Sequence, residues 1–348
     1  KNCDSVGFAN RYRLKDGENP FRMGTVRQAK ATKRKKTSQV SYQPRFKEAG
    51  KYAVYVSYQS LPKSVSDARY IVYHKGEATE FSVNQRMGGG TWVYLGTFDF
   101  DKGCNEFNRV VCTNKASRRG VVTTDAVRFG GGMGNIERGG YTSGLPRCLE
   151  GARYYAQWAG APYKVYGGRK GENDYADDIN TRSLMTNWLG GGSVYMPAKN
   201  GKQVPIELSL ALHSDAGYNK DGKSTFGALA ICTTDYNDGI LNSGISRFTS
   251  KDFARALRDN LVTDLTAQFG EFGKRYLWDR NYSETRLPEV PSAILEMLSH
   301  QNFPDMRIAQ DPLGKFYIAR SIYKTILRFV NSNHGTRYVV QPLAPQNF

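Results

Sequence analysis

The first third of the chain alternates hydrophobic and polar residues with a period of two. In KYAVYVSYQ (51–59) large side chains fall at every second position, and four similar runs follow: ARYIVYHK, TEFSVNQ, TWVYLGTFDF and NRVVCTN. Glycine, proline, asparagine or aspartate separate these runs. Such spacing predicts short strands and is typical of a β-sandwich.

The pattern changes after the glycine-rich stretch 130–140. Helical periodicity runs through 143–160, where Ser143 is the expected N-cap, through 249–270, where Thr249-x-x-Asp252 forms a capping box, and through 311–330. Short apolar runs lie between these helices: YKVYG, IELSLALH, GALAICTT and SAILEML. Alternating strands and helices predict an α/β sheet that helices cover on both faces.

We therefore expect two domains, an all-β sandwich over residues 1–135 and an α/β domain over residues 136–348, with a mixed sheet flanked by helices. Positive charge is concentrated in the first domain. Residues 1–135 hold 24 lysines and arginines against 11 aspartates and glutamates, a net charge of +13 out of +17 for the whole chain. A field of this sign attracts anionic glycans, nucleic acid or anionic lipid headgroups.

Other sequence features restrict the class of protein. The basic run KATKRKKTS is either a solvated loop or part of an anion-binding surface. No nucleic-acid-binding motif accompanies it, so we do not expect a nucleic-acid partner. No apolar run approaches the ~18 residues of a membrane span. The five cysteines lack C-x-x-C spacing, and Cys104 and Cys112 are either a disulfide across adjacent strands or buried thiols.

Polar side chains end two of the predicted apolar strands. LSLALHSDAG (208–217) contains His213, and PSAILEML (291–298) contains Glu296. Ligands gather outside the carboxyl ends of strands in α/β sheets, so we expect these two residues to meet at one rim. A strand-end histidine alone is more often structural. Burying an unpaired carboxylate costs roughly several kcal/mol, so Glu296 should have a cation, a metal or a proton to share.

Glu150, which arginines flank in the sequence, is either a surface ion-pair residue or a zinc ligand. At these residues the chain resembles the zinc-dependent N-acetylmuramoyl-L-alanine amidase family over residues 143–330. Three segments carry the resemblance: CLEGARYYAQWAGAPYKVYGGR, LALHSDAG and VPSAILEMLSHQN. The resemblance implies that Glu150 and His213 bind Zn²⁺ and that Glu296 serves catalysis. The family takes another histidine ligand from an earlier strand, which we expect upstream of Lys1.

The resemblance also implies a mechanism and a substrate. Zinc would activate a water and polarise the amide carbonyl, and Glu296 would carry the proton to the leaving amine. The bond cut would join muramic acid to L-alanine in peptidoglycan. Asp215 would orient His213 or line the cleft, or it would simply form a turn. His300 would stabilise an oxyanion or cap a strand.

Residues 1–135 resemble the golvesin C-terminal-like β domain found beside such amidases and in xanthan-lyase-labelled proteins of Bacteroidetes. EAGKYAVYVSY, FSVNQRMGGGTWVYLGTF and TTDAVRFGGGMGN carry this resemblance. Trp92 and Tyr94 would stack on sugar rings or pack in the core. The expected protein is an extracytoplasmic zinc amidase whose partner is peptidoglycan or another anionic cell-envelope glycan. The alternative is a non-catalytic glycan-binding or structural envelope protein with an incomplete amidase-like domain.

Overall fold

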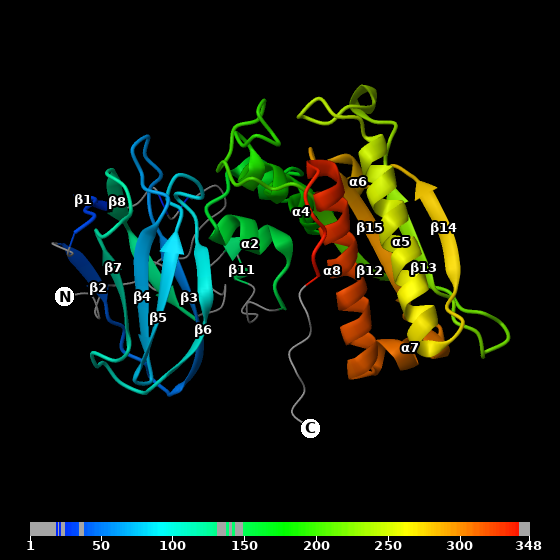
Figure 1. The fold of residues 1–348 in the computed structure, drawn as a ribbon, viewed down its shortest axis with the longest axis horizontal. Coiled ribbons are helices and arrows are strands. Elements are labelled where there is room, and N and C mark those ends of the chain that lie inside the picture. Colours follow the sequence, from blue (N-terminus) through cyan, green and yellow to red (C-terminus); the bar gives the residue numbers. More distant parts are fainter. Residues whose placement is uncertain are drawn as a thin grey trace. The chain divides into compact units, whose positions relative to one another are not determined.

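The computed structural model describes residues 19, 21, 25–34, 38–130, 137–138, 141–142 and 149–340 (Figure 1). The chain divides into two compact units, Lys1–Pro205 and Ile206–Phe348. The sequence predicts a domain boundary near residue 135, where the composition changes. The contacts place the division about 70 residues later because two of the helices that follow, Ala152–Trp158 and Asp174–Gly190, pack against the β-sandwich of the first unit.

The first unit contains a sandwich of antiparallel sheets, as the alternating pattern predicts (Figure 1). One sheet has the order β2 (Gln39–Tyr42), β7 (Arg109–Thr113), β4 (Ala68–His74) and β5 (Glu77–Val83). The other has the order β6 (Val93–Phe100), β3 (Gly50–Ser57) and β9 (Ala126–Phe129). Two shorter antiparallel pairs are β1 (Arg27–Lys30) with β8 (Val121–Thr124), and β10 (Glu137–Arg138) with β11 (Tyr141–Thr142).

Strand β3 is buried on both of its faces. Val54 and Val56 point into the sandwich core, which they share with side chains such as Tyr70 of β4. The intervening Tyr55 points the other way, and its ring lies 5.1 Å from that of Trp158. Successive side chains of a strand alternate between its faces, so this one strand holds the sandwich on one side and helical residues on the other.

The helices of the first unit are α2 (Ala152–Trp158), α3 (Tyr163–Tyr166) and α4 (Asp174–Gly190). The predicted N-cap Ser143 lies outside the described residues, and the described helix begins only at Ala152. The strand predicted at YKVYG is wrong, because these residues form the single helical turn α3. Val165 and Tyr166 of this turn pack against α2. The sequence pattern did not predict α4, because the buried side of this helix is largely polar and shows no apolar periodicity.

The second unit contains a four-stranded mixed sheet, which confirms the predicted fold class. Its order is β12 (Ser209–Asp215), β15 (Ser292–Ser299), β13 (Ala228–Cys232) and β14 (Lys274–Asp279). β12 is parallel to β15, β15 is antiparallel to β13, and β13 is parallel to β14. The connecting elements are the 3₁₀ turn η3 (Asn237–Gly239) and the helices α5 (Phe248–Phe269), α6 (Ser283–Arg286), α7 (Phe303–Gln310) and α8 (Pro312–His334).

Helices α5 and α8 cover one face of this sheet (Figure 1). The period-four residues Phe253, Leu257, Leu261 and Leu265 of α5 are buried there, as the sequence predicts. The predicted capping box is wrong, because α5 already begins at Phe248 and its N-cap makes no side-chain hydrogen bond. The sequence reading missed strand β14, whose sequence KRYLWD mixes charged and aromatic residues on a sheet edge.

Two other sequence expectations concern cysteines and membranes. No disulfide joins Cys104 and Cys112: both are thiols, and Cys112 is buried in β7. Burial raises the pKa of the Cys112 thiol to about 12, so it stays protonated at neutral pH. Among the helices of the described residues, none is both long and apolar enough to cross a bilayer.

Candidate active site

His213 and Glu296 lie next to each other on the parallel strands β12 and β15. In the β12–β15 register His213 is the direct partner of Glu296, and 3.9 Å separates its Nδ1 from Glu296 Oε1. The residues before Glu296 in β15 are buried on both faces of the sheet. Leu295 faces the helices, so Glu296 and Ile294 face the opposite side of the sheet. The predicted meeting of the two side chains is therefore present in the structure.

Glu284 is a third member of this cluster, and the sequence reading missed it. Its Oε2 lies 3.0 Å from His213 Nε2, and its side chain is 12% exposed. Glu284 comes from the single turn α6, which Thr285 anchors: the Thr285 hydroxyl lies 2.7 Å from that of Thr233, and Ser292 donates to the Thr285 carbonyl. No periodicity in four helical residues could have shown that this turn would face the histidine.

Arg275 supplies a positive charge beside the same carboxylates. The β13–β14 register shifts between Ala228 and Ala230, so two β14 residues lie opposite Leu229. Such a bulge redirects side chains from the regular alternation. The Arg275 guanidinium donates to Asp215 Oδ2 at 2.7 Å and lies over the Phe226 ring at 4.1 Å. Asp215 thus has an ion-pair partner in addition to the backbone hydrogen bond from Ala216 to its Oδ1.

The electrostatic setting favours the protonated form of Glu296. Burial is the largest effect and raises its pKa, and the charges of Asp215 and Glu284 act in the same direction. His213 and Arg275 oppose this shift but do not cancel it. Glu296 Oε2 is buried and has no hydrogen-bond partner among the residues that the structure describes. Burying a polar oxygen without a hydrogen bond costs free energy, so a proton, an ion or a ligand that bound to this oxygen would stabilise it.

His300 follows β15 directly and is tied to the end of β12. Its backbone N–H donates to the Asp215 carbonyl at 2.9 Å, and its Nδ1 lies 3.2 Å from the Ser214 hydroxyl. These contacts join the carboxyl ends of the two strands. The structure therefore gives His300 a structural connection, and a role in an oxyanion site stays a prediction.

The remaining predicted site residues belong to the first unit. Glu150 is half-buried and lies just before α2 rather than within its first turn. Trp92 packs into a cluster with Trp158, at 6.0 Å between ring centroids, and with Phe21 at 5.2 Å. Tyr94 is 54% exposed, and its hydroxyl lies 2.8 Å from that of Thr97. Of the two aromatics predicted to contact glycan, Tyr94 presents its ring to solvent.

The donor types of a zinc site are present, but a full ligand set is not. Imidazole and carboxylate groups are ligands that zinc prefers. Across the described part of the chain, however, no three histidine, cysteine, aspartate or glutamate side chains are arranged to hold a metal ion. We therefore derive no catalytic step through a metal.

Comparison with known proteins gives one family match and several matches to solved structures. The Golvesin C-terminal domain family model matches residues 15–131. Xanthan lyase of Bacillus sp. (strain GL1) is 34% identical over 97 residues, which are 27% of this chain and 10% of that protein. The solved structure of Paenibacillus xanthan lyase matches with 24% identity and a TM-score of 0.25, over 30% of this chain and 12% of the lyase.

Among solved structures, the N-acetylmuramyl-L-alanine amidase from Mycobacterium smegmatis matches with 20% identity and a TM-score of 0.33, over 50% of this chain and 79% of the amidase. This chain spans only about a tenth of the xanthan lyases, so the match to them concerns one domain. Within that limit, residues 15–131 are similar in sequence to the Golvesin C-terminal domain family.

Proposed function

We propose that the second unit is a hydrolase that cleaves an amide bond with Glu296 as its general acid–base. The observation that carries this proposal is the buried, unpartnered Oε2 of Glu296 beside His213 on one face of the sheet. A catalytic carboxyl works best when its pKa is shifted towards the working pH, and burial raises the pKa of Glu296 in that direction.

In the proposed reaction Glu296 takes a proton from the attacking water as the new carbon–oxygen bond forms. It then gives this proton to the leaving nitrogen as the carbon–nitrogen bond breaks, so the carboxylate is regenerated. His213 lies within 3.9 Å of the carboxylate and Glu284 fixes the other side of the imidazole ring. Arg275, which Asp215 holds in place, supplies a positive charge that partly opposes the rise in the pKa of Glu296.

Zinc is part of this proposal because the sequence resembles zinc amidases at Glu150 and His213. In the second unit His213 would be a ligand of the ion, and the ion would supply a Lewis acid for the amide carbonyl. The zinc content of the purified chain, measured by mass spectrometry, tests this without an activity assay. We expect bound zinc in the wild-type chain and its loss in His213→Ala, with Glu271→Gln as a control that retains it. Equal zinc content in all three chains would contradict the assignment of His213 as a ligand.

The proposed substrate is the bond between N-acetylmuramic acid and L-alanine in peptidoglycan, and the proposed location is extracytoplasmic. Both follow from the order of the Glu150, His213 and Glu296 segments in the sequence. The direct test is release of stem peptides from purified peptidoglycan. Glu296→Gln keeps the size of the side chain but cannot carry the proton, so we expect a loss of roughly 10²- to 10⁴-fold in rate.

Glu271→Gln is the matched control, since it makes the same chemical change at an exposed position of the second unit. We expect it to retain the wild-type rate. Equal rates in Glu296→Gln and the wild type would refute the assigned role. A wild-type chain that binds peptidoglycan without cleaving it would favour the alternative, a non-catalytic glycan-binding envelope protein.

A further inference from the structure

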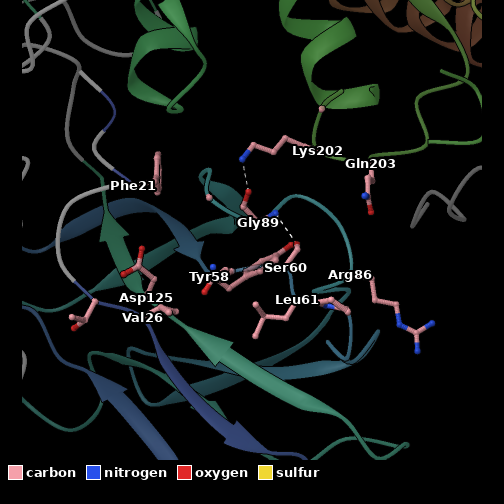
Figure 2. Close-up of a pocket in the computed structure, with 15 residues that line it drawn as sticks. Phe21, Val26, Tyr58, Ser60, Leu61, Arg86, Gly89, Asp125, Lys202 and Gln203 are labelled. Atoms are coloured by element: carbon pink, nitrogen blue, oxygen red, sulfur yellow. Dashed lines mark hydrogen bonds between the residues drawn. The ribbon is translucent and has the colours of Figure 1, made fainter. Parts of the chain in front are cut away.

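A pocket of about 820 Å³ with both polar and apolar groups in its walls opens within the first unit, and none of its lining residues is among those assigned to hydrolysis (Figure 2). Its walls come from segments that are distant in sequence: 58–62 after β3, residues 86, 89 and 90 before β6, and 201–203 after α4. Asp125 and Phe21 complete it at one end. The volume lies in the range of about 300–1,000 Å³ that is usual for small-ligand sites.

The pocket is held open by hydrogen bonds between these segments. Lys202 connects its own segment to α4 and to the segment before β6: its N–H donates to the Trp188 carbonyl, its carbonyl accepts from Gly88, and its ammonium donates to the Gly89 carbonyl at 2.6 Å. Gly89 in turn donates to the Ser60 hydroxyl at 3.0 Å. A Cβ at Gly89 would lie 2.3 Å from the Ser60 backbone nitrogen, so the close approach requires glycine. The pocket is therefore pre-formed.

Asp125 presents a hydrogen-bond acceptor at one end of the pocket. Figure 2 shows its carboxylate directed into the open space on the side of Phe21. Its backbone is fixed independently, because its N–H donates to the Ser57 carbonyl and its carbonyl accepts from the Tyr42 hydroxyl. The Ser57 hydroxyl donates to one carboxylate oxygen, Oδ2, at 3.3 Å. A fixed carboxylate beside an aromatic ring is a common arrangement for binding a hydroxyl-bearing ring, which needs an acceptor and an apolar face.

Arg86 presents a positive charge at the other end of the pocket. Its Nε donates to the Ser64 carbonyl at 3.1 Å, which orients the guanidinium while the residue stays exposed. Figure 2 shows the guanidinium on the side of the pocket opposite Asp125 and directed away from it. A guanidinium binds a carboxylate through two parallel hydrogen bonds, so this end favours an anionic group. The net charge of +13 over residues 1–135 attracts anionic chains to the same domain.

We propose that this pocket binds a segment of an acidic oligosaccharide, with sugar hydroxyls on Asp125 and a sugar carboxylate on Arg86. The lining excludes the other obvious classes of ligand. An apolar molecule would cover the charged groups of Asp125, Lys202 and Arg86 without offering them a hydrogen bond, and a polyphosphate would meet the Asp125 carboxylate. The proposal does not depend on the hydrolase assignment, because it concerns binding by the first unit alone.

The test is calorimetric titration of the whole chain with trigalacturonate and with neutral cellotriose, neither of which has an amide bond that the proposed hydrolase could cleave. We expect trigalacturonate to bind and cellotriose to bind at least tenfold more weakly. Arg86→Gln should weaken trigalacturonate binding about tenfold, because a hydrogen bond to a charged group is worth about 1.5–3 kcal/mol. Asp125→Asn should weaken it severalfold.

The matched controls are Arg118→Gln and Asp101→Asn, which make the same changes at exposed positions of the same domain outside the pocket. We expect both to bind within twofold of the parent chain, and thermal unfolding to show that all four variants are folded. Equal affinity for the two trisaccharides would overturn the proposal. So would equal weakening by Arg118→Gln and Arg86→Gln, because binding would then follow the net charge of the domain and not this pocket.

Discussion

His213 and Glu296 are direct partners in the register of two parallel strands, with 3.9 Å between Nδ1 and Oε1. Glu284 approaches the other ring nitrogen at 3.0 Å, so two carboxylates bracket one imidazole. This arrangement gives the two glutamates different roles. Glu296 has a buried oxygen that lacks a partner among the described residues, whereas Glu284 fixes the orientation of the histidine ring.

Glu284→Gln should therefore lower the hydrolytic rate without abolishing it. Loss of a carboxylate that orients a functional histidine typically costs about 10- to 100-fold. We expect the loss in kcat and little change in KM, because Glu284 acts through His213 and not on the substrate. Steady-state kinetics on soluble muropeptides would measure it, with Glu271→Gln as the control. A change confined to KM would show instead that Glu284 contacts substrate.

The ion pair between Arg275 and Asp215 should contribute measurable coupling energy. Its N–O distance is 2.7 Å, and the two side chains are only 14% and 31% exposed. A double-mutant cycle with Arg275→Met and Asp215→Asn, read by urea unfolding, should give a coupling of about 1 kcal/mol or more. The comparison pair is Arg255 with Asp252, which is solvent-exposed and should give less than about 0.5 kcal/mol. Equal coupling in the two pairs would contradict a special role for the partly buried one.

Asp279 should make stability depend on pH in the acid range. Burial opposes its ionisation, but hydrogen bonds from Thr234 and the Lys251 ammonium outweigh burial and lower its pKa. A carboxyl with a lower pKa in the folded state binds fewer protons when folded than when unfolded. Its stabilisation is therefore complete above the unfolded value of about 3.9 and is lost as pH falls through the folded value.

We expect Asp279→Asn to lower the free energy of unfolding by about 1 kcal/mol at pH 7. The difference from wild type should shrink as the pH is lowered below about 4. Urea unfolding at a series of pH values measures both effects, with the exposed Asp252→Asn as the control. A difference that stays constant down to pH 2 would mean that the carboxylate charge is not the cause.

Leu257 should be a principal stabilising residue of the second unit. It is 1% exposed, and it packs between α5 and the sheet. Leu257→Ala removes buried methyl groups and leaves a cavity, so we expect a loss of about 3 kcal/mol in the free energy of unfolding. Leu313→Ala makes the same change at a position that is 46% exposed and should cost less than about 1 kcal/mol. Chemical denaturation would measure the free energy of unfolding of both variants. Similar losses of stability in the two variants would argue against the packing described for α5.

Local patterns in the sequence were sufficient for much of the fold. Period-two alternation located β3 to β7, and period-four apolar residues located α5 and α8. The two apolar runs ending at His213 and Glu296 correctly indicated neighbouring strand ends. These predictions succeeded because burial of one face of a strand or helix requires apolar residues at regular intervals in the sequence. They failed at YKVYG, where four residues are too few to separate a strand from a helical turn.

The sequence by itself determined the two kinds of domain, the Golvesin-type sandwich, and the pairing of His213 with Glu296. Only the tertiary structure brought Glu284 and Arg275 to this pair, moved α2 to α4 into the first unit, and closed the pocket between Ser60, Gly89 and Lys202. The physical reason is the range of the interactions. Burial of one face of a strand or helix produces a periodic pattern of apolar residues that are close in sequence. A bulge, a single helical turn or a loop contact depends instead on segments that meet only after folding.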